Sequence, residues 1–528
     1  MNTHVIFSQA CSKIVYSSNR DGFVRPFLIE MKNPVEPRVS GIDIGESRDF
    51  IAQSLAPDCQ TLAMVSDHGG DGLFEIFLYD LQRSSLRRVT DTPGRDEGKP
   101  LFAPKAPLLA YLTDGRLSLY DYVRTRRSPV PEVSQRFQTI IWADDGASLF
   151  LEDERSDIWR YDVAGSKFHK LWTAPQPGLF VRTISEHHEH LFFNSDHETA
   201  FRQIYDLDLQ TASLKRLYPT QHDQFSPEQL NDGRHTFRTN VDGSFMAVEL
   251  VNGKPQMRSP TSGVVYDFSL AFGPPLLLYS NDHLPANLYW FEKGRLKPLI
   301  ATGLDARQPD AILIRNSSGA ANFLYLPSQA PRGLLVWLHG GPHEQVSPRF
   351  NLFFDFFARE NIAVYAINYP GSTGFGKDYA MYGRSQEELI PIQVQSIDRD
   401  ISQLRRLRPT LRPLVLVGVS YGSVLAHLVA ATHPEFNRLI DFSGVASQST
   451  VPDPGSKSHT YPSTLFIYGA DDAFSKTSDR AALLARYESH AKVSRLILPR
   501  EGHYIDRRDS IDRILMSMDA FIKTPFHR

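Results

Sequence analysis

The chain has 528 residues with a formal net charge of −3, and 41% of its residues are hydrophobic. This length allows two or more domains, each with a buried core of its own. The small net charge gives no electrostatic reason to expect binding to nucleic acid or to an anionic membrane.

The cysteines and the apolar runs bear on the compartment in which the protein works. The chain has two cysteines, Cys11 and Cys59, which are too few for a disulfide scaffold. They could pair with each other, but we expect both to stay reduced. The first residues lack the pattern of a signal peptide, and no apolar run approaches the ~20 residues of a membrane span. We therefore expect a cytoplasmic protein.

An irregular repeat runs through residues 1–303. Each copy combines a short apolar strand, a polar turn with Asp or Gly, an aromatic strand, and a strand of basic and apolar residues. The copies begin at Ile14, Leu62, Leu108, Ser148, Leu191, Ser244 and Leu276. One such unit cannot bury both of its faces, so stacking in a closed ring is expected. We predict a β-propeller of seven blades, to within about one blade; a large β-sandwich is the alternative.

Residues 185–190 resemble a metal cluster, because they contain three histidines and two glutamates. They lie where other copies of the repeat have a polar turn before a strand. We interpret them as a solvated turn, and we expect neither a metal nor another cofactor.

The pattern changes in residues 304–528. An antiparallel pair of strands is expected first, and buried strands then alternate with helices. The expected strands are 311–314, 322–327, 333–338 and 362–367, and the expected helices are about 350–360 and 392–406. This alternation predicts an α/β-hydrolase domain with a mostly parallel, doubly wound sheet and helices on both faces.

A candidate nucleophile elbow spans residues 418–422, with the sequence Gly-Val-Ser-Tyr-Gly. An apolar run at 413–417 precedes it and a helical pattern follows it, which is the strand, turn and helix that such an elbow requires. Gly418 and Gly422 leave room for a strained backbone that holds the Ser420 hydroxyl clear of the sheet. We predict that Ser420 is the nucleophile.

A serine needs a base and an orienting carboxylate to act as a nucleophile. In α/β hydrolases the chain order is nucleophile, acid, histidine. Asp471 and Asp472 come directly after one later strand, and His503 comes after the next. Because the carboxyl ends of parallel strands meet at one edge of the sheet, these groups should lie near Ser420. We predict His503 as the base; the two aspartates compete as the acid, and we favour Asp472.

The oxyanion of an acyl-transfer reaction needs two hydrogen-bond donors. One should be the N–H of Tyr421, at the start of the helix after the nucleophile. The other should come from the glycine-rich turn at 339–342, where missing side chains let the backbone approach a substrate. We choose the N–H of Gly341.

Five motifs resemble those of the prolyl oligopeptidase family of serine peptidases. They are His-Gly-Gly-Pro-His at 339–343, Asn-Tyr-Pro-Gly-Ser-Thr-Gly-Phe-Gly at 368–376, the elbow at 418–422, Tyr-Gly-Ala-Asp-Asp at 468–472 and Glu-Gly-His at 501–503. The resemblance covers nearly the whole chain, since the family joins an N-terminal propeller to an α/β hydrolase. It implies that Asp472 is the acid and that Gly341 is an oxyanion donor. His339 stands where dipeptidyl peptidase members have a tyrosine, which indicates the acylaminoacyl-peptidase branch.

The chain departs from the family pattern at four places. Ser423 replaces the last glycine of the elbow motif, and Tyr468 replaces a histidine. About 17 residues separate Gly444 from Tyr461, where relatives have a longer insert that helps to form the wall of the substrate pocket. We also see no segment before the propeller that would pack on the hydrolase.

The resemblance implies a serine peptidase that acts through an acyl-enzyme on short peptides, with the propeller limiting access. The alternative is an esterase, an amidase or a cyclising acyltransferase that uses the same residues on a small acylated metabolite. A third reading, a catalytically inactive scaffold, is disfavoured because Ser420, Asp472 and His503 are all present. We expect a small-molecule substrate and no nucleic-acid or membrane partner; homo-oligomerisation is left open.

Overall fold

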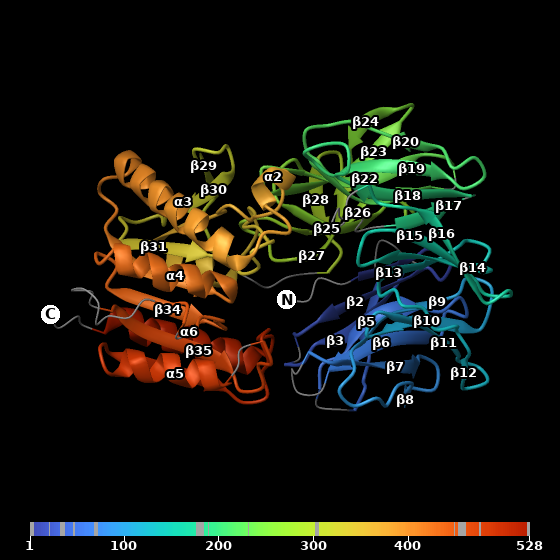
Figure 1. Ribbon diagram of the computed structural model, residues 1–528, viewed down its shortest axis with the longest axis horizontal. Coiled ribbons are helices and arrows are strands. Elements are labelled where there is room, and N and C mark those ends of the chain that lie inside the picture. The colour runs from blue at the N-terminus through green and yellow to red at the C-terminus, as the bar shows by residue number, and fades with distance from the viewer. Residues whose placement is uncertain are drawn as a thin grey trace.

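The computed structural model describes residues 5–524 except 21, 32–36, 46–47, 68–71, 176–183, 188, 231, 301–305, 448, 452–460 and 475–476. An all-β part and an α/β part lie side by side (Figure 1). The predicted boundary between residues 303 and 304 lies outside the described residues. Among the described residues, no helix is long and apolar enough to cross a membrane.

Strands β1 to β20 form five antiparallel sheets of four strands, in which chain neighbours are sheet neighbours. The first two sheets contain β1 (Val5–Ser8), β2 (Lys13–Ser18), β3 (Arg25–Glu30) and β4 (Arg38–Gly41), then β5 (Ile51–Leu55), β6 (Thr61–Asp67), β7 (Phe74–Asp80) and β8 (Ser85–Arg88). The next two contain β9 (Glu97–Phe102), β10 (Leu108–Thr113), β11 (Arg116–Asp121) and β12 (Arg126–Ser128), then β13 (Phe137–Trp142), β14 (Ser148–Asp153), β15 (Ile158–Asp162) and β16 (Lys167–Trp172). The fifth contains β17 (Ile184–His187), β18 (His190–Ser195), β19 (Gln203–Asp208) and β20 (Leu214–Arg216).

The remaining strands of this part form one sheet of eight strands. They are β21 (Asp223–Gln229), β22 (His235–Val241), β23 (Ser244–Val251), β24 (Lys254–Met257), β25 (Val264–Ser269), β26 (Leu276–Ser280), β27 (Asn287–Glu292) and β28 (Arg295–Pro298). This sheet consists of two antiparallel units, β21–β24 and β25–β28, which are joined by the parallel pair Phe245 and Val264.

Tight hairpins produce the regular pairing within each sheet. The turn between β10 and β11 consists of Asp114 and Gly115, whose φ angles are 47° and 78°. Positive φ at both central residues is the feature of a type I′ turn, whose twist matches that of the flanking strands. The polar Asp-Gly turns of the repeat therefore connect consecutive antiparallel strands, as the sequence predicted.

Alternate residues of each strand pack against opposite neighbours. Ile14 and Tyr16 of β2 belong to a cluster with Leu278 of β26, whereas Val15 packs with Met64 of β6. Similar buried clusters link each sheet or four-stranded unit to the next along the chain. Because the first sheet also packs on the last unit, the series closes on itself, as in a propeller.

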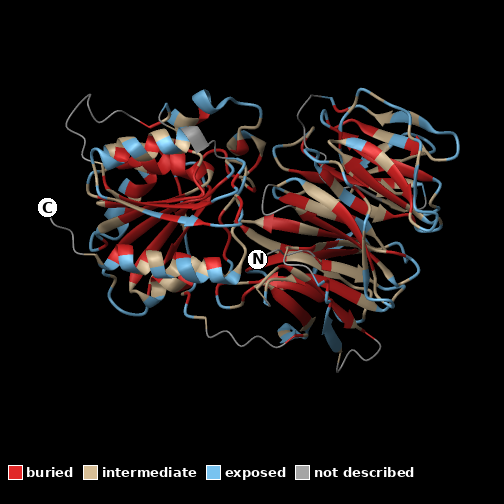
Figure 2. Cartoon of the chain, turned by 90° about the horizontal axis from the view of Figure 1, so that it is seen from below, coloured by how far each residue is buried: buried red, intermediate tan, exposed pale blue. Residues whose placement is uncertain are grey.

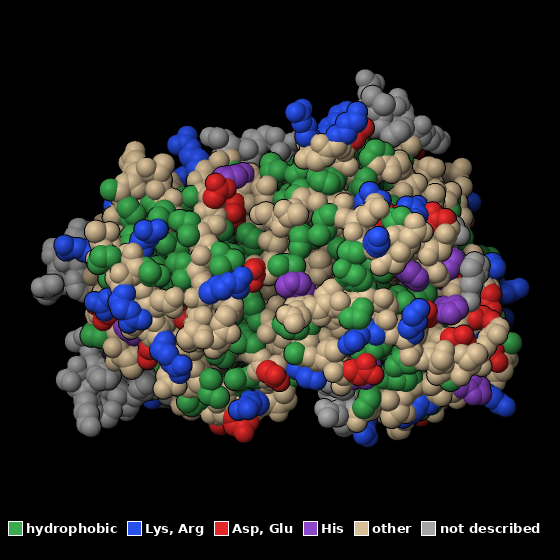
Figure 3. Space-filling view, turned by 90° about the horizontal axis from the view of Figure 1, so that it is seen from above, with side chains coloured by type: hydrophobic (Ala, Val, Ile, Leu, Met, Phe, Trp, Pro, Cys, Tyr) green, Lys and Arg blue, Asp and Glu red, His purple; other side chains and the backbone are tan. Residues whose placement is uncertain are grey.

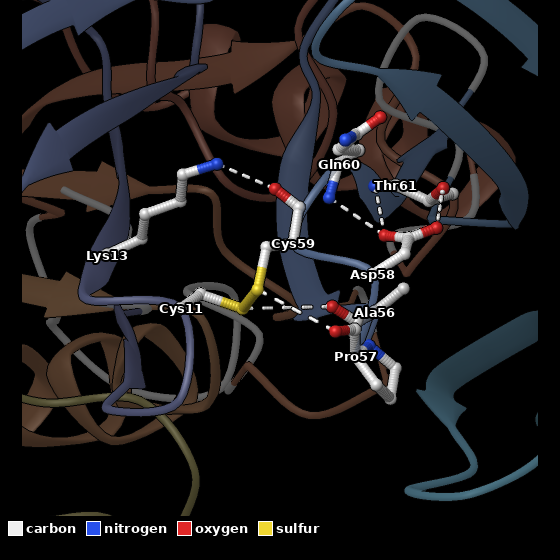
Figure 4. Close-up of a disulfide and its surroundings, with 8 residues drawn as sticks. All are labelled: Cys11, Lys13, Ala56, Pro57, Asp58, Cys59, Gln60 and Thr61. Atoms are coloured by element: carbon white, nitrogen blue, oxygen red, sulfur yellow. Dashed lines mark hydrogen bonds between the residues drawn. A yellow bond between two sulfur atoms is a disulfide. The ribbon is translucent and has the colours of Figure 1, made fainter.

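A disulfide joins Cys11 to Cys59, so our prediction that both cysteines stay reduced is wrong (Figure 4). Cys11 lies between β1 and β2, and Cys59 lies between β5 and β6. The Lys13 ammonium group adds a second link, because it donates a hydrogen bond of 2.6 Å to the Cys59 carbonyl oxygen. The bridge therefore joins the first two sheets.

The α/β part contains an eight-stranded sheet in the order β29-β30-β32-β31-β33-β34-β35-β36. Its strands are β29 (Ile312–Arg315), β30 (Ala321–Tyr325), β31 (Gly333–Leu338), β32 (Ile362–Ile367), β33 (Pro413–Val419), β34 (Arg438–Phe442), β35 (Ser463–Gly469) and β36 (Val493–Leu498). Strand β30 runs antiparallel to both of its neighbours, β29 and β32, and the pairs from β32 to β36 are parallel. The predicted α/β-hydrolase architecture is confirmed.

Helices cover both faces of this sheet, and buried residues fill the layers between them (Figure 2). The helices are α1 (Leu352–Arg359), α2 (Lys377–Ala380), α3 (Gln386–Leu407), α4 (Tyr421–Thr432), α5 (Thr477–Glu488) and α6 (Arg508–Lys523). Phe354 of α1 and Met518 of α6 pack on one face, and Ile401 of α3 and Leu425 of α4 pack on the other.

Helix α3 begins six residues before the start predicted from the sequence, at 386 instead of about 392. Ser385 caps it, because the Ser385 hydroxyl accepts the Glu388 N–H and the Glu388 carboxylate accepts the Ser385 N–H. This capping box stabilises the first turn. Pro391 lies inside the helix and removes one backbone hydrogen bond near its start, which is why the sequence suggested a later beginning.

Hydrogen bonds connect turns of the all-β part to the α/β part. Arg315 makes a two-pronged ion pair with Asp242, at 2.8 and 2.6 Å. The Lys377 ammonium group donates to the Asp196 carbonyl oxygen at 2.9 Å, and the Asn19 amide donates to a backbone carbonyl of the α/β part at 2.7 Å. On the face seen in Figure 3, basic and acidic side chains are intermingled.

Candidate active site

Ser420 lies in a sharp turn between β33 and α4. Its φ and ψ angles are 50° and −118°, a conformation that a non-glycine residue rarely adopts. A Cβ atom on Gly418 would lie 2.5 Å from the Gly422 carbonyl oxygen, and one on Gly422 would overlap the Leu338 carbonyl oxygen. Gly418 is therefore required by the close approach of β33 to the start of α4, and Gly422 by the packing of the turn against β31, as expected for a nucleophile elbow.

Hydrogen bonds bring Ser420, His503 and Asp472 together. The His503 Nε2 atom lies 2.9 Å from the Ser420 Oγ atom. The His503 Nδ1 atom lies 3.2 and 3.1 Å from the two carboxylate oxygens of Asp472. The Asp472 side chain is fully buried, whereas His503 is partly accessible. In this arrangement the imidazole can accept the hydroxyl proton while the carboxylate fixes its orientation.

The geometry separates the two aspartates that the sequence left in competition. Asp472 faces the imidazole of His503, and its carboxylate also accepts the Phe474 N–H at 3.0 Å. Asp471 is exposed, and its N–H donates to the Glu501 carbonyl oxygen at 2.9 Å. Of the two aspartates, only Asp472 therefore directs its side chain toward the base.

The glycine-rich turn after β31 lies against the nucleophile. A Cβ atom on Gly340 would come within 3.3 Å of the Ser420 Cβ atom and 3.9 Å of its Oγ atom. Gly341 has a φ angle of 118° and is exposed. Within the described part of the chain, neither the Gly341 N–H nor the Tyr421 N–H has a hydrogen-bond acceptor. Both donors are therefore free to bind a substrate oxygen.

His339 packs against this turn and holds its backbone by a hydrogen bond. Its Nδ1–H lies 2.6 Å from the Gly340 carbonyl oxygen, and its Nε2 atom lies 2.7 Å from the Ser372 hydroxyl. The Tyr369 ring stacks on the imidazole with centroids 4.3 Å apart. Burial lowers the pKa of His339 to about 4, so the imidazole is neutral at pH 7. The motif at 368–376 thus fixes the backbone next to Ser420.

Sequence reasoning missed several residues around the site. Gln393 of α3 accepts the Tyr421 hydroxyl at 2.7 Å and donates to the Pro370 carbonyl oxygen at 2.8 Å. Phe474 and Tyr504 are exposed aromatic residues whose rings lie next to His503, with centroids 4.8 and 5.6 Å from the imidazole. No local sequence pattern marked Gln393, because its partners lie on other elements.

Two of the departures from the family pattern, Ser423 and Tyr468, lie within the described residues, in or next to one buried cluster. The Ser423 hydroxyl accepts the Ala446 N–H at 3.3 Å, which connects α4 to the segment after β34. Tyr468 is buried on β35. Most of the shortened segment that follows Gly444, namely residues 448 and 452–460, lies outside the described residues.

The two described histidines of residues 185–190, His187 and His190, have different carboxylate partners. His187 pairs with Asp144 at 3.1 Å and His190 pairs with Asp206 at 2.8 Å, while His188 lies outside the described residues. Within the described ranges, no group of three or more His, Cys, Asp or Glu side chains could hold a metal ion.

Known proteins share this architecture. The α/β hydrolase family model matches residues 335–512. Dipeptidyl aminopeptidase BIII of Pseudoxanthomonas mexicana is 30% identical over 461 residues, which are 76% of this chain and 64% of that protein. The mouse (Mus musculus) acylamino-acid-releasing enzyme is 26% identical over 156 residues, 27% of this chain and 20% of that enzyme. The chain thus covers less than two thirds of the length of these relatives.

Solved structures extend the similarity to the whole chain. A prolyl endopeptidase structure superposes with a TM-score of 0.81 at 13% identity, covering 98% of this chain and 89% of that one. The resemblance to the prolyl oligopeptidase family is confirmed. Acylaminoacyl peptidase of Pyrococcus horikoshii, with a TM-score of 0.72 at 14% identity, covers 98% of this chain and 95% of that one. The prolyl oligopeptidase-like fold thus includes both the all-β part and the α/β part.

Proposed function

We propose that this protein is a serine hydrolase that cleaves short peptides through an acyl-enzyme intermediate. The observation that carries the proposal is the chain of hydrogen bonds from Ser420 through His503 to Asp472. The names of the similar proteins, which include a dipeptidyl aminopeptidase and acylamino-acid-releasing enzymes, favour peptides as the substrate class.

The roles of the three side chains follow from this chain of contacts. Ser420 Oγ attacks the scissile carbonyl carbon while His503 Nε2 accepts the hydroxyl proton. Asp472 holds the Nδ1–H tautomer and stabilises the imidazolium ion that forms. His503 then gives the proton to the leaving nitrogen, and the C–N bond breaks. Water, activated by His503, attacks the acyl-enzyme and regenerates Ser420.

The N–H groups of Tyr421 and Gly341 are the proposed oxyanion donors. Tyr421 directly follows Ser420, and Gly341 follows Gly340, where a Cβ atom would lie 3.3 Å from the Ser420 Cβ atom. Neither N–H has an acceptor in the described part of the chain. Donors that are already oriented stabilise the charge of the tetrahedral intermediate, and losing one typically lowers turnover by roughly 10²–10³. An oxygen atom of the substrate, rather than a protein group, would accept the hydrogen bonds of these two N–H groups.

The all-β part is proposed to be a seven-bladed propeller, over residues 1–303, that limits access to a hydrolase domain at 304–528. Five four-stranded sheets and two linked four-stranded units support this number. The cluster that joins β2 to β26 and β27 supports closure of the ring by packing between its first and last blades. A closed ring beside the site would admit short peptides and exclude folded proteins.

The sequence predicts a cytoplasmic protein, in part because a reducing compartment is the simpler interpretation of two cysteines. The disulfide between Cys11 and Cys59 weighs against it, because such bridges form and persist mainly in oxidising compartments. We therefore propose an oxidising compartment as the working environment.

A substrate screen tests the proposed activity. Aminoacyl and peptidyl arylamides are compared with small acyl esters, and Ser420→Ala serves as the inactive control. We expect arylamide turnover that Ser420→Ala abolishes. Ester turnover without arylamide turnover would replace the peptidase with the alternative, an esterase or acyltransferase on a small acylated substrate.

A further inference from the structure

A cavity of about 160 Å³ adjoins the candidate active site. Gly340, next to the proposed oxyanion donor, and Val419, next to the nucleophile, form part of its wall. Glu344, Gln345 and Arg349 supply its polar groups. The cavity therefore begins at residues that flank the nucleophile and the glycine-rich turn, and it continues along the loop that follows this turn.

The cavity lies on the same side of the sheet as the base. Trp337, Phe354 and Val419 of its wall belong to the apolar cluster that α1 and α6 cover. The loop that carries His503 leads directly into α6. Since the imidazole must deliver its proton to the leaving nitrogen, the part of a substrate that leaves should occupy this side.

Arg349 has hydrogen-bond donors to spare. Within the described part of the chain its guanidinium group makes one hydrogen bond, 3.0 Å to the hydroxyl of Tyr266 on β25, and its charge lies 5.9 Å from the centre of that ring. A guanidinium group has five N–H donors and binds carboxylates in a two-pronged manner. Tyr266, which belongs to the all-β part, thus orients a cation that no carboxylate among the described residues binds directly. Tyr266 raises the pKa of Arg349, and the charge of Glu344, in the wall of the same cavity, raises it further but leaves the remaining N–H donors available.

Glu344 marks the end of the cavity nearest to the reacting atoms. A Cβ atom on Gly341 would lie 3.0 Å from the Glu344 backbone nitrogen. Tyr504 is the residue after His503. Burial raises the pKa of Tyr504, and the negative charge of Glu344 raises it further. Among the described residues its carboxylate has no hydrogen-bond or ion-pair partner. The Glu344 carboxylate at this end can bind the amino group that cleavage releases, and the guanidinium group at the Arg349 end can bind an anion.

We propose that this cavity binds the leaving half of a short peptide and that Arg349 binds its C-terminal carboxylate. The proposal rests on the proposed peptidase function and specifies its substrates, which are short peptides with a free C-terminus. Cleavage gives a leaving fragment with a new amino group at one end and a carboxylate at the other. Glu344 and Arg349 have the matching charges, in the same order.

The test compares one short peptide as the free acid and as the C-terminal amide, with the wild-type protein and the Arg349→Met variant. A charge-assisted hydrogen bond is typically worth about tenfold or more in binding. We expect the wild type to prefer the acid by about tenfold or more in kcat/KM. In Arg349→Met this preference should disappear because kcat/KM falls for the acid and stays the same for the amide. Arg412→Met is the matched control and should keep the preference. Arg412 directly precedes β33, at the end of that strand opposite to Ser420.

Two further readouts keep the outcomes distinct. Fluorophosphonate labelling and hydrolysis of a small ester, which contains no carboxylate, report whether Arg349→Met is still folded and active. Equal rates on acid and amide in the wild type, or an acid preference that survives in Arg349→Met, would overturn the role of Arg349. Failure of the proposed function itself looks different, because then neither peptide is cleaved and Ser420 is not labelled.

Discussion

At the scale of single residues, the site depends on which carboxylate faces the imidazole. Asp472 is buried against His503, whereas its neighbour Asp471 is exposed. We expect Asp472→Asn to lower kcat by about 10⁴, because an amide stabilises the wrong tautomer of the histidine. Asp471→Asn should change kcat by less than about twofold, because the exposed Asp471 side chain does not contact the imidazole and surface substitutions usually change stability by only about 0.5 kcal/mol or less. Steady-state kinetics on one substrate compares the two, and equal losses would refute the assignment of Asp472.

His339 gives the site a pH-dependent stability. Burial lowers its pKa to about 4 from the ordinary 6.5, so the unfolded chain binds a proton in a pH range where the folded chain does not. The contribution to stability is complete above pH 6.5 and is lost as the pH falls toward 4, by about 3 kcal/mol in total. His339→Gln cannot titrate, so its unfolding midpoint should fall less between pH 7 and 4.5 than that of the wild type. Parallel curves would contradict this prediction.

At the scale of elements, the disulfide is the covalent link between the first two sheets. A bridge that spans 48 residues of sequence typically stabilises a fold by about 2–4 kcal/mol. We expect a reductant to lower the thermal unfolding midpoint of the wild type and to leave that of the double variant Cys11→Ser, Cys59→Ser unchanged. Differential scanning calorimetry measures both, and a midpoint that does not respond to reduction in the wild type would contradict the prediction.

The sequence predicted those elements whose signals are local. Alternating buried strands and helices indicated the parallel sheet, and the strand ends indicated where Ser420, Asp472 and His503 would meet. The pairing of Cys11 with Cys59 had no local signal, because it depends on how two sheets stack. Contacts between the two parts, such as Tyr266 with Arg349, could not be predicted for the same reason.

At the scale of the whole molecule, the all-β part borders the site and supplies some of its contacts. The Asn240 amide of β22 donates to the Gln345 side chain at 3.1 Å, and Gln345 follows the proposed oxyanion turn. A ring in this position should act as a size filter. We expect short peptides to be cleaved and a folded protein substrate to remain intact under the same conditions, as measured by mass spectrometry of the products. Cleavage of the folded protein at a comparable rate would contradict the filter.

The central claim is that Ser420, activated by His503, is the group that attacks the substrate. Mass spectrometry after treatment with a fluorophosphonate tests it most directly. The account predicts a single covalent adduct on the peptide that contains Ser420, formed far more slowly in His503→Ala and absent in Ser420→Ala. An adduct on another residue, or labelling that persists in Ser420→Ala, would contradict it.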